Sequence, residues 1–269
     1  MKTNDIIKYP RTKHIEGSGL QKGDEDLEIV HFGHLRGKML VVEEKIDGAN
    51  TGISFTSDGD LLLQCRGHYL LGGDWPEFDQ FKTWGNTFAN ELFDILEDRY
   101  IMYGEWMYAF HSVYYDMLPH YFMEFDIYDK QNKVFLDTPR RHAITQACKA
   151  VIEPVRVIKT SQFHAIEELL DLIGLSAFVT EGALQDLDRA CKDVGWTDED
   201  RRNVLTLNSS RVMEGLYIKW EEDGIVKERY KYVRSGFVQS IKDYGKHWTE
   251  RKTIPNRLAP NRGLFEVRS

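Results

Sequence analysis

Apolar and polar positions along this chain follow two repeats, and together they predict an α+β protein. Alternation with a period of two predicts a strand, a turn and a strand within residues 39–67. It predicts further strands at Tyr100–Tyr108, Tyr121–Tyr128, Met213–Trp220 and Ile225–Val233. Helical spacing of apolar residues predicts a helix between Asn86 and Glu97.

Two of these patterns carry spatial expectations. The strand pair within residues 39–67 is expected to place Lys45 and Arg66 on one sheet. In the strand that begins at Tyr121, alternation places Met123, Phe125 and Ile127 on a single face.

Between Thr138 and about Leu207 the pattern becomes helical. Thr138-Pro139 is a suitable cap and first-turn pair, and helical spacing recurs near Arg140–Ala150, Ile166–Ile173, Leu184–Val194 and Thr197–Leu205. We interpret residues 138–207 as a helical insertion within one domain that spans residues 1–269.

Composition places the chain among ordinary globular proteins, with 42% hydrophobic and 29% charged residues. No apolar stretch is long enough to span a membrane, and the first residues lack a signal-peptide core, so a cytoplasmic location is expected. Cys65, Cys148 and Cys191 lack the spacing of a zinc site, and the nine histidines are dispersed.

The net charge of −8 is unevenly distributed. Residues 227–269 contain eleven basic and four acidic residues, a net charge of +7, which leaves −15 on the remainder. A basic tail over about residues 234–269, with Lys246, Arg251 and Lys252, is therefore a candidate RNA contact. A solvated amphipathic helix explains the same tail equally well.

The segment Val41-Val42-Glu43-Glu44-Lys45-Ile46-Asp47-Gly48-Ala49-Asn50 brings one lysine to a turn. A lysine becomes a nucleophile when burial or neighbouring cations lower its pKa. Taken alone, this segment is more typical of a solvated hairpin turn. Five further short blocks follow in order: Cys65-Arg66-Gly67, Tyr103-Gly104-Glu105, Glu124-Phe125-Asp126-Ile127-Tyr128, Glu214-Gly215-Leu216-Tyr217-Ile218-Lys219 and Arg229-Tyr230-Lys231-Tyr232.

This ordered set resembles motifs I, Ia, III, IIIa, IV and V of the covalent nucleotidyltransferases. Over roughly residues 38–234 the chain is most similar to the type 2 phage RNA ligases and their bacterial relatives. The resemblance implies a ligase adenylyltransferase fold, with antiparallel β-sheets flanked by helices. About 35 residues follow Val233, too few for an OB-fold domain.

The resemblance also implies the chemistry of the site. ATP and Mg²⁺ (or Mn²⁺) would be the cofactors, and Lys45 would be the nucleophile that forms lysyl-AMP, with Lys219, Lys231 and the metal lowering its pKa. The other implied roles are adenine recognition by Glu44, purine stacking by Phe125, sugar and phosphate contacts by Arg66 and Glu105, metal or ribose positioning by Glu214, α-phosphate contacts by Arg229 and Lys231, and shaping of the turn by Asp47 and Asn50.

Each residue has a structural alternative. Phe125 on an alternating strand is, by itself, more typical of a core residue than of a purine platform. Glu105 and Glu214 beside glycines are also typical of turns, and Lys219, Arg229 and Lys231 of a solvated sheet face. Their joint occurrence in motif order favours the nucleotide site.

The expected function is an ATP-dependent RNA ligase that joins 5′-phosphate and 3′-hydroxyl ends in RNA repair. An end-healing kinase–phosphatase is a candidate partner. Terminal phosphate recognition is assigned to the residues Lys8, Arg11, Lys13 and His14. The alternatives are an AMP transferase with a non-RNA acceptor, a DNA-nick ligase, and an RNA-binding module on a degenerate ligase fold.

Overall fold

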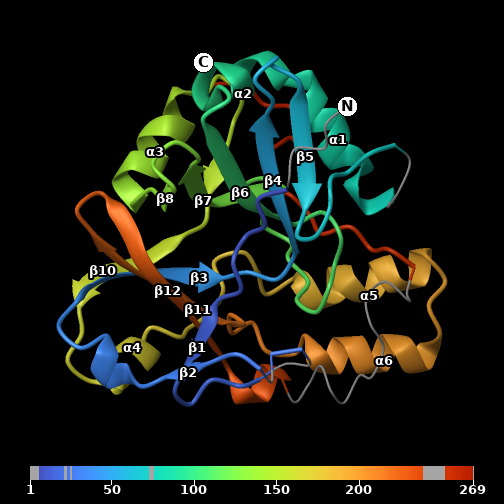
Figure 1. Ribbon diagram of the computed structural model, residues 1–269. Coiled ribbons are helices and arrows are strands. Elements are labelled where there is room, and N and C mark those ends of the chain that lie inside the picture. Colours follow the sequence, from blue (N-terminus) through green and yellow to red (C-terminus); the bar gives the residue numbers. More distant parts are fainter. Residues whose placement is uncertain (1–5, 21–22, 25, 73–75, 239–251, 269) are drawn as a thin grey trace.

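Two β-sheets flanked by helices form the body of the molecule, as a computed structural model shows (Figure 1). The structure describes residues 6–20, 23–24, 26–72, 76–238 and 252–268. The first sheet has the order β10-β3-β11-β12-β1-β2, with β10 Val157–Gln162, β3 Met39–Lys45, β11 Gly215–Glu222, β12 Ile225–Val233, β1 Lys13–Ile15 and β2 Ile29–Val30. Its strands are antiparallel except for β1, which pairs in parallel with β12 and β2.

The second sheet has the order β5-β4-β6-β7-β8, with β4 Ala49–Phe55, β5 Leu61–Cys65, β6 Tyr100–Trp106, β7 Phe122–Asp129 and β8 Val134–Phe135. All neighbours along this path are antiparallel, and the short strand β9 Glu153–Pro154 adds a parallel pair to β7. The predicted α+β class with antiparallel sheets is confirmed, and neither sheet closes into a barrel within the described residues.

Helices pack against both sheets and against the loop that follows β6. They are α1 Asp79–Thr87, α2 Ala89–Leu96, α3 Thr138–Ala147, α4 Ile166–Leu170, α5 Ala183–Asp193 and α6 Asp198–Leu207, with the short 3₁₀ turns η1 Phe32–His34 and η2 Pro76–Phe78. Phe81 and Trp84 of α1 pack on Phe122 of the second sheet, whereas Leu169 of α4 packs on Leu40 of the first. No helix in the described residues is long and apolar enough to cross a membrane.

The chain changes sheets directly after Lys45. Strand β3 ends at Lys45 in the first sheet, and β4 begins at Ala49 in the second. Residues 46–48 therefore form a crossover, and the expectation that Lys45 and Arg66 share a sheet is wrong. Alternation within each strand was correctly recognised, but a local pattern does not show which sheet a strand joins.

A β-bulge at Phe125 also corrects the expected face of β7. Tyr103 pairs with Asp126 and Gly104 pairs with Glu124, so Phe125 is the extra residue. Met123 and Phe125 pack in the cluster between the sheets, whereas Ile127 packs under the helices. The bulge reverses the alternation because it inserts one residue into a period of two.

The segment expected to be a helical insertion holds α3 to α6, but it also supplies two strands. Strand β10 pairs with β3 and forms an edge of the first sheet. The cap of α3 differs as well, because the side chain of Asp137 accepts the N–H of Arg140 while Thr138 donates to Glu221. Strand β10 lies at the edge of the sheet and its sequence is largely polar. Apolar alternation therefore indicates this strand only weakly.

The structure describes two parts of the basic tail: residues 235–238 are helical with Phe237 and Val238 buried, whereas residues 252–268 form bridges and turns and no helix. Isolated bridges join residues 252–268 to three distant segments, and Ile254, Asn256 and Leu264 are buried. Asn256 accepts the N–H of Tyr115 and donates to the carbonyl of Met107. This segment therefore packs against the loop that follows β6.

A buried ion network joins the two sheets to α3. Arg141 is fully buried and donates to Glu43 of β3 at 2.7 Å and to Glu124 of β7 at 2.9 Å. Lys219 of β11 lies 3.0 Å from Glu43 and 3.3 Å from Asp126 of β7. Burying these charges is costly unless every one is paired, so the network holds the sheets in one arrangement.

We expect Arg141→Met to lower the free energy of unfolding by about 3–5 kcal/mol, because it leaves two carboxylates buried without their cation. Urea denaturation near neutral pH measures this loss. The matched control is Arg140→Met on the exposed side of the same helix, which should change stability by about 0.5 kcal/mol or less. Equal losses for the two variants would contradict the role given to the network.

Candidate active site

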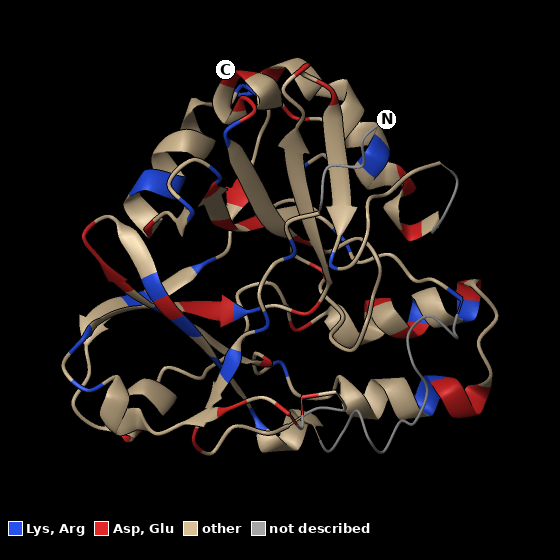
Figure 2. Ribbon diagram, viewed as in Figure 1, with Lys and Arg blue, Asp and Glu red and all other residues tan. Residues whose placement is uncertain are grey.

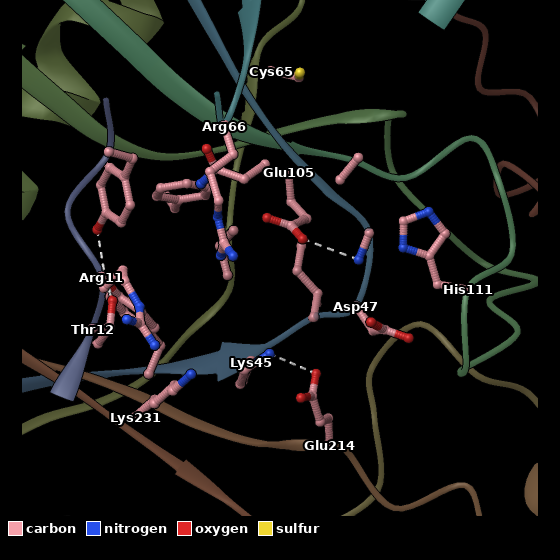
Figure 3. A pocket seen from close by; sticks show the side chains of 18 of the residues that line it. Arg11, Thr12, Lys45, Asp47, Cys65, Arg66, Glu105, His111, Glu214 and Lys231 are labelled. Atoms are coloured by element: carbon pink, nitrogen blue, oxygen red, sulfur yellow. Dashed lines mark hydrogen bonds and ion pairs between the residues drawn. The ribbon is translucent and has the colours of Figure 1, made fainter. Parts of the chain in front are cut away.

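A cavity of about 660 Å³ opens where the chain crosses between the sheets. This volume is typical of small-molecule sites. Its walls come from β3 and the crossover, from the ends of β5 and β6, from the start of β11, and from residues 9–12 of the amino-terminal segment. Figure 3 shows Lys45 near its centre, with Arg11 and Lys231 on one side and Asp47 and Glu214 on the other.

Lys45 forms an ion pair with Glu214, with Nζ 2.7 Å from Oε2. The side chain of Lys45 is 23% exposed and that of Glu214 only 1%. Burial alone would lower the pKa of Lys45, but the charges of Glu214, Asp47 and Glu105 outweigh it and raise this pKa. The expectation that neighbouring cations lower it is therefore not met in the nucleotide-free protein, where Lys45 is a cation.

Two acidic side chains hold the crossover in place by accepting hydrogen bonds from backbone N–H groups. Asp47 Oδ2 accepts the N–H groups of Ser112 and Val113, at 2.8 and 3.2 Å. Glu105 Oε1 accepts the N–H of Gly48 at 3.1 Å. Asp47 therefore shapes the turn, as predicted, and Asn50 lies beside it in the wall, paired in register with Glu105.

Two motif glycines stand where no larger residue fits. A Cβ on Gly48 would lie 2.7 Å from the carbonyl oxygen of Trp106. A Cβ on Gly215 would lie 1.8 Å from the carbonyl oxygen of Tyr232. Both contacts are shorter than real carbon atoms allow, so these glycines let the backbone bring Lys45 and Glu214 together.

Phe125 and Glu44 form a polar and aromatic part of the wall. Phe125 is almost buried, and Tyr9 packs edge-on against its ring with centroids 5.0 Å apart. Glu44 Oε2 accepts the N–H of Ala177, while its buried Oε1 has no hydrogen-bond partner among the described residues. An open acceptor beside an aromatic ring suits a purine with an exocyclic amino group. Their contacts with adenine stay predictions.

Lys231 lies in the wall, but a carboxylate already holds it. Its Nζ is 2.8 Å from Asp24 Oδ2, and both side chains are 16% exposed. Burial, together with the charge of Lys45, lowers the pKa of Lys231, although Asp24 opposes this shift. Arg66 also lines the cavity, on its exposed side, and Figure 3 shows it above Lys45.

The structure does not bring Lys219 or Arg229 to the cavity wall. Lys219 is fully buried, and its Nζ donates to Glu43 and to the carbonyl of Phe125. Arg229 lies over the ring of Phe135 at 3.8 Å, and its Nε is 3.4 Å from Asp126. Lys219 and Arg229 therefore lie behind the wall, whereas Lys231 lies in it. Motif spacing cannot separate these positions because the three residues lie on the neighbouring strands β11 and β12.

The predicted phosphate-binding residues of the amino-terminal segment separate in the structure. Arg11 lines the cavity and pairs with Asp26 at 2.7 Å. Lys13 instead pairs with Glu28, and His14 is fully buried against Asp24 and Ser18. Lys8 is exposed and does not line the cavity. Lys13 and His14 do not line the cavity, and their contact with a terminal phosphate stays a prediction.

Of the three predicted RNA contacts in the tail, the structure describes one. Lys246 and Arg251 lie outside the described residues. Lys252 donates to the carbonyl of Val194 at the end of α5, away from the cavity wall. Figure 2 shows acidic and basic residues mixed along β3 and β12 rather than gathered on one basic face.

Sequence reasoning missed several residues of the wall. Tyr9, Thr12 and Asp24 all come from the amino-terminal segment, which lies outside the motif set. Tyr9 and Thr12 both contact the hydroxyl of Tyr217 on β11. No local pattern in this segment indicates the parallel pairing of β1 with β12.

The cavity carries more acidic than basic side chains. The acidic ones are Asp24, Glu43, Glu44, Asp47, Glu77, Glu105 and Glu214, and the basic ones are Arg11, Lys45, Arg66 and Lys231. Their formal sum is −3, and one of the acidic residues, Glu43, is also paired with Arg141 and Lys219 behind the wall. Oxygen ligands of this kind suit Mg²⁺ or Mn²⁺. Among the described residues, no group of three such side chains is placed to hold a metal.

The family model described as RNA ligase matches residues 38–233, most of the chain. The chain belongs to the RNA ligase family. The matched range includes all six sequence blocks and both sheets except β1 and β2. Comparison with curated protein sequences finds no match.

Solved structures similar to this RNA ligase family member include three of a Naegleria gruberi RNA ligase. A variant with ATP and Mn has a TM-score of 0.51 at 17% identity, over 79% of this chain and 54% of that one. A variant with AMP and Mn has a TM-score of 0.52 at 16% identity, with the same coverage. The ligase with PPi has a TM-score of 0.50 at 17% identity, over 78% of this chain and 53% of that one. This chain spans about half the length of those ligases, and the likeness shows a shared fold.

We expect the free energy of unfolding of Glu105→Gln to increase relative to that of the wild type as pH rises. The difference between these two free energies is called the gap. Burial raises the pKa of Glu105 to about 7, with Asp47 adding to the shift and Lys45 opposing it. A carboxyl group whose pKa is raised by folding stabilises the protein at low pH, and this contribution is lost as pH rises through 7. The amide does not titrate, so the gap should grow by about 1–2 kcal/mol between pH 5 and 8.

Denaturant unfolding at several pH values measures that gap. Glu222→Gln at the exposed end of β11 is the control for the same change of a carboxyl group to an amide on the surface. A gap for Glu105→Gln that stays constant or narrows with rising pH would refute the charge balance described here.

Proposed function

We propose that this protein is an ATP-dependent RNA ligase that activates 5′-phosphate ends through an adenylylated lysine. The observation that carries the proposal is the placement of Lys45. Its amine lies in a nucleotide-sized cavity, 2.7 Å from Glu214, with Phe125 and the open acceptor of Glu44 in the same wall. Membership of the RNA ligase family supports RNA as the substrate.

In the first step, Lys45 Nζ attacks the α-phosphorus of ATP. A P–N bond forms, the P–O bond to pyrophosphate breaks, and pyrophosphate leaves. Because the neighbouring carboxylates raise the pKa of Lys45, its ammonium group must first give up a proton. Glu214, which lies 2.7 Å away and whose pKa burial raises to about 7, would accept it. Added positive charge near Nζ favours that loss.

The residues that would hold the nucleotide follow from their positions in the wall. Phe125 would stack on adenine, and Glu44 would accept a hydrogen bond from the adenine amino group. Arg66 and Lys231 would contact phosphate oxygens. A bound Mg²⁺ or Mn²⁺ supplies positive charge that offsets the acidic wall and favours the uncharged amine. Glu214 and Asp47 are the nearest carboxylates that could share in holding it.

In the later steps, the 5′-phosphate of RNA takes AMP from Lys45 and becomes an adenylylated end. The 3′-hydroxyl of a second end then attacks that phosphate, so a phosphodiester forms and AMP leaves. Work in RNA repair after an end-healing kinase–phosphatase suits this pair of ends, and that partner is part of the proposal. The cytoplasmic location and the single-domain organisation expected from the sequence stay predictions.

Wild-type protein incubated with α-labelled ATP and Mg²⁺ should acquire a covalent label. The label should be released by acid and should resist alkali, because a P–N bond to an amine has that stability. Lys45→Ala should lose about a thousandfold or more of the label, because the nucleophile is gone. Lys159→Ala on the exposed edge strand is the matched control and should label normally. An unlabelled wild type would end the enzymatic proposal.

Lys45→Ala should still seal an RNA nick whose 5′ end is already adenylylated, without ATP, because Lys45 acts only in the earlier steps. Gel separation of joined and unjoined strands measures this reaction. The wild type should join 5′-phosphorylated RNA more efficiently than a DNA nick of the same sequence. Labelling without any joined RNA would instead support an AMP transferase with another acceptor, and preferred sealing of DNA would support a DNA-nick ligase.

A further inference from the structure

Asp24 occupies an unusual place for a carboxylate in a phosphate-binding cavity. It comes from the amino-terminal segment, outside the residues that the family model matches. Its Oδ2 lies 2.8 Å from Lys231 Nζ and 3.0 Å from His14 Nε2, and its Oδ1 lies 3.9 Å from Arg11. Asp24 therefore touches two of the four basic side chains that line the cavity.

These contacts are built into the fold. His14 and Lys231 are register partners in the parallel pair of β1 and β12, and His14 is fully buried. His14 Nδ1 bonds to Ser18 at 2.7 Å, and Ser18 in turn accepts the N–H of Val233 at the end of β12. Buried His14 therefore holds Asp24 Oδ2, the same oxygen that contacts Lys231.

The position of Asp24 sets up competition with phosphate. A phosphate oxygen that binds Lys231 must approach the same ammonium group that Asp24 holds, and two like charges within about 4–6 Å repel. A divalent cation on the polyphosphate removes part of this repulsion. A metal-free polyphosphate retains its full charge and meets the full repulsion.

We propose that Asp24 is a specificity-determining residue that makes the cavity select metal-bound over metal-free polyphosphate. It acts as the counter-ion of Lys231 until a polyphosphate that carries a metal displaces it. The inference rests on the proposed function, because it takes this cavity to be the site of the ATP phosphates. It goes further by assigning metal selectivity to a carboxylate outside the ligase motifs.

The test is binding of inorganic pyrophosphate by calorimetry, in EDTA and again with excess Mg²⁺. Asp24→Asn removes the charge and keeps an oxygen that can accept from Lys231. In EDTA this variant should bind pyrophosphate about threefold to tenfold more tightly than the wild type, because one like charge is gone. With Mg²⁺ the difference should fall below about twofold. A merely structural role for Asp24 would weaken binding in both conditions.

Glu28→Gln is the matched control, since Glu28 is an acidic residue of the same segment that pairs with Lys13 and does not line the cavity. It should bind pyrophosphate like the wild type in both conditions. Thermal melting shows whether each variant is folded, and Asp24→Ser answers the same question if the asparagine variant is not. Equal or weaker binding by a folded, uncharged variant in EDTA would overturn the proposal.

The binding test needs no chemistry at Lys45, so its failure can be told apart from failure of the proposed function. A wild type that acquires the label on Lys45, together with an uncharged variant that binds no tighter, refutes the role of Asp24 alone. A wild type that neither labels nor binds pyrophosphate with Mg²⁺ refutes both.

Discussion

The ion pair between Lys45 and Glu214 is the interaction on which the site depends. It joins the end of β3 to the start of β11, and it holds the one amine at the centre of the cavity as a cation. The charges of Glu214, Asp47 and Glu105 raise the pKa of Lys45 and so favour its charged form, which is not nucleophilic. The same pair keeps the amine at a defined place, which limits the motion needed before attack.

Close backbone contacts and buried ion pairs around the cavity hold Lys45 and Glu214 together. Gly48 and Gly215 allow backbone approaches that a Cβ would block, and Glu105 and Asp47 fix the crossover by accepting backbone N–H groups. Behind the wall, Arg141 and Lys219 tie both sheets together through buried carboxylates. A cavity between two sheets needs such a tie, because its shape depends on how the sheets are placed.

The charge of the cavity is the second constraint. Acidic side chains exceed basic ones, and both lysines of the wall are paired with carboxylates. A phosphate that contacts either lysine therefore meets an ion pair that is already present. The amino-terminal segment takes part through Asp24 and Arg11, although it lies outside the family match.

The sequence by itself determined the α+β class, most strands, five of the helices and the motif residues of the wall, because these depend on local alternation and on short blocks. Helix α1 and strand β10 were missed, since their patterns are short or polar. Only the tertiary structure decided that Lys45 and Arg66 come from different sheets, that Lys219 and Arg229 lie behind the wall, and that Asp24 holds Lys231. Those facts depend on a sheet crossover, a bulge and a parallel strand pair between residues far apart in the chain, and no local pattern specifies which distant strands meet.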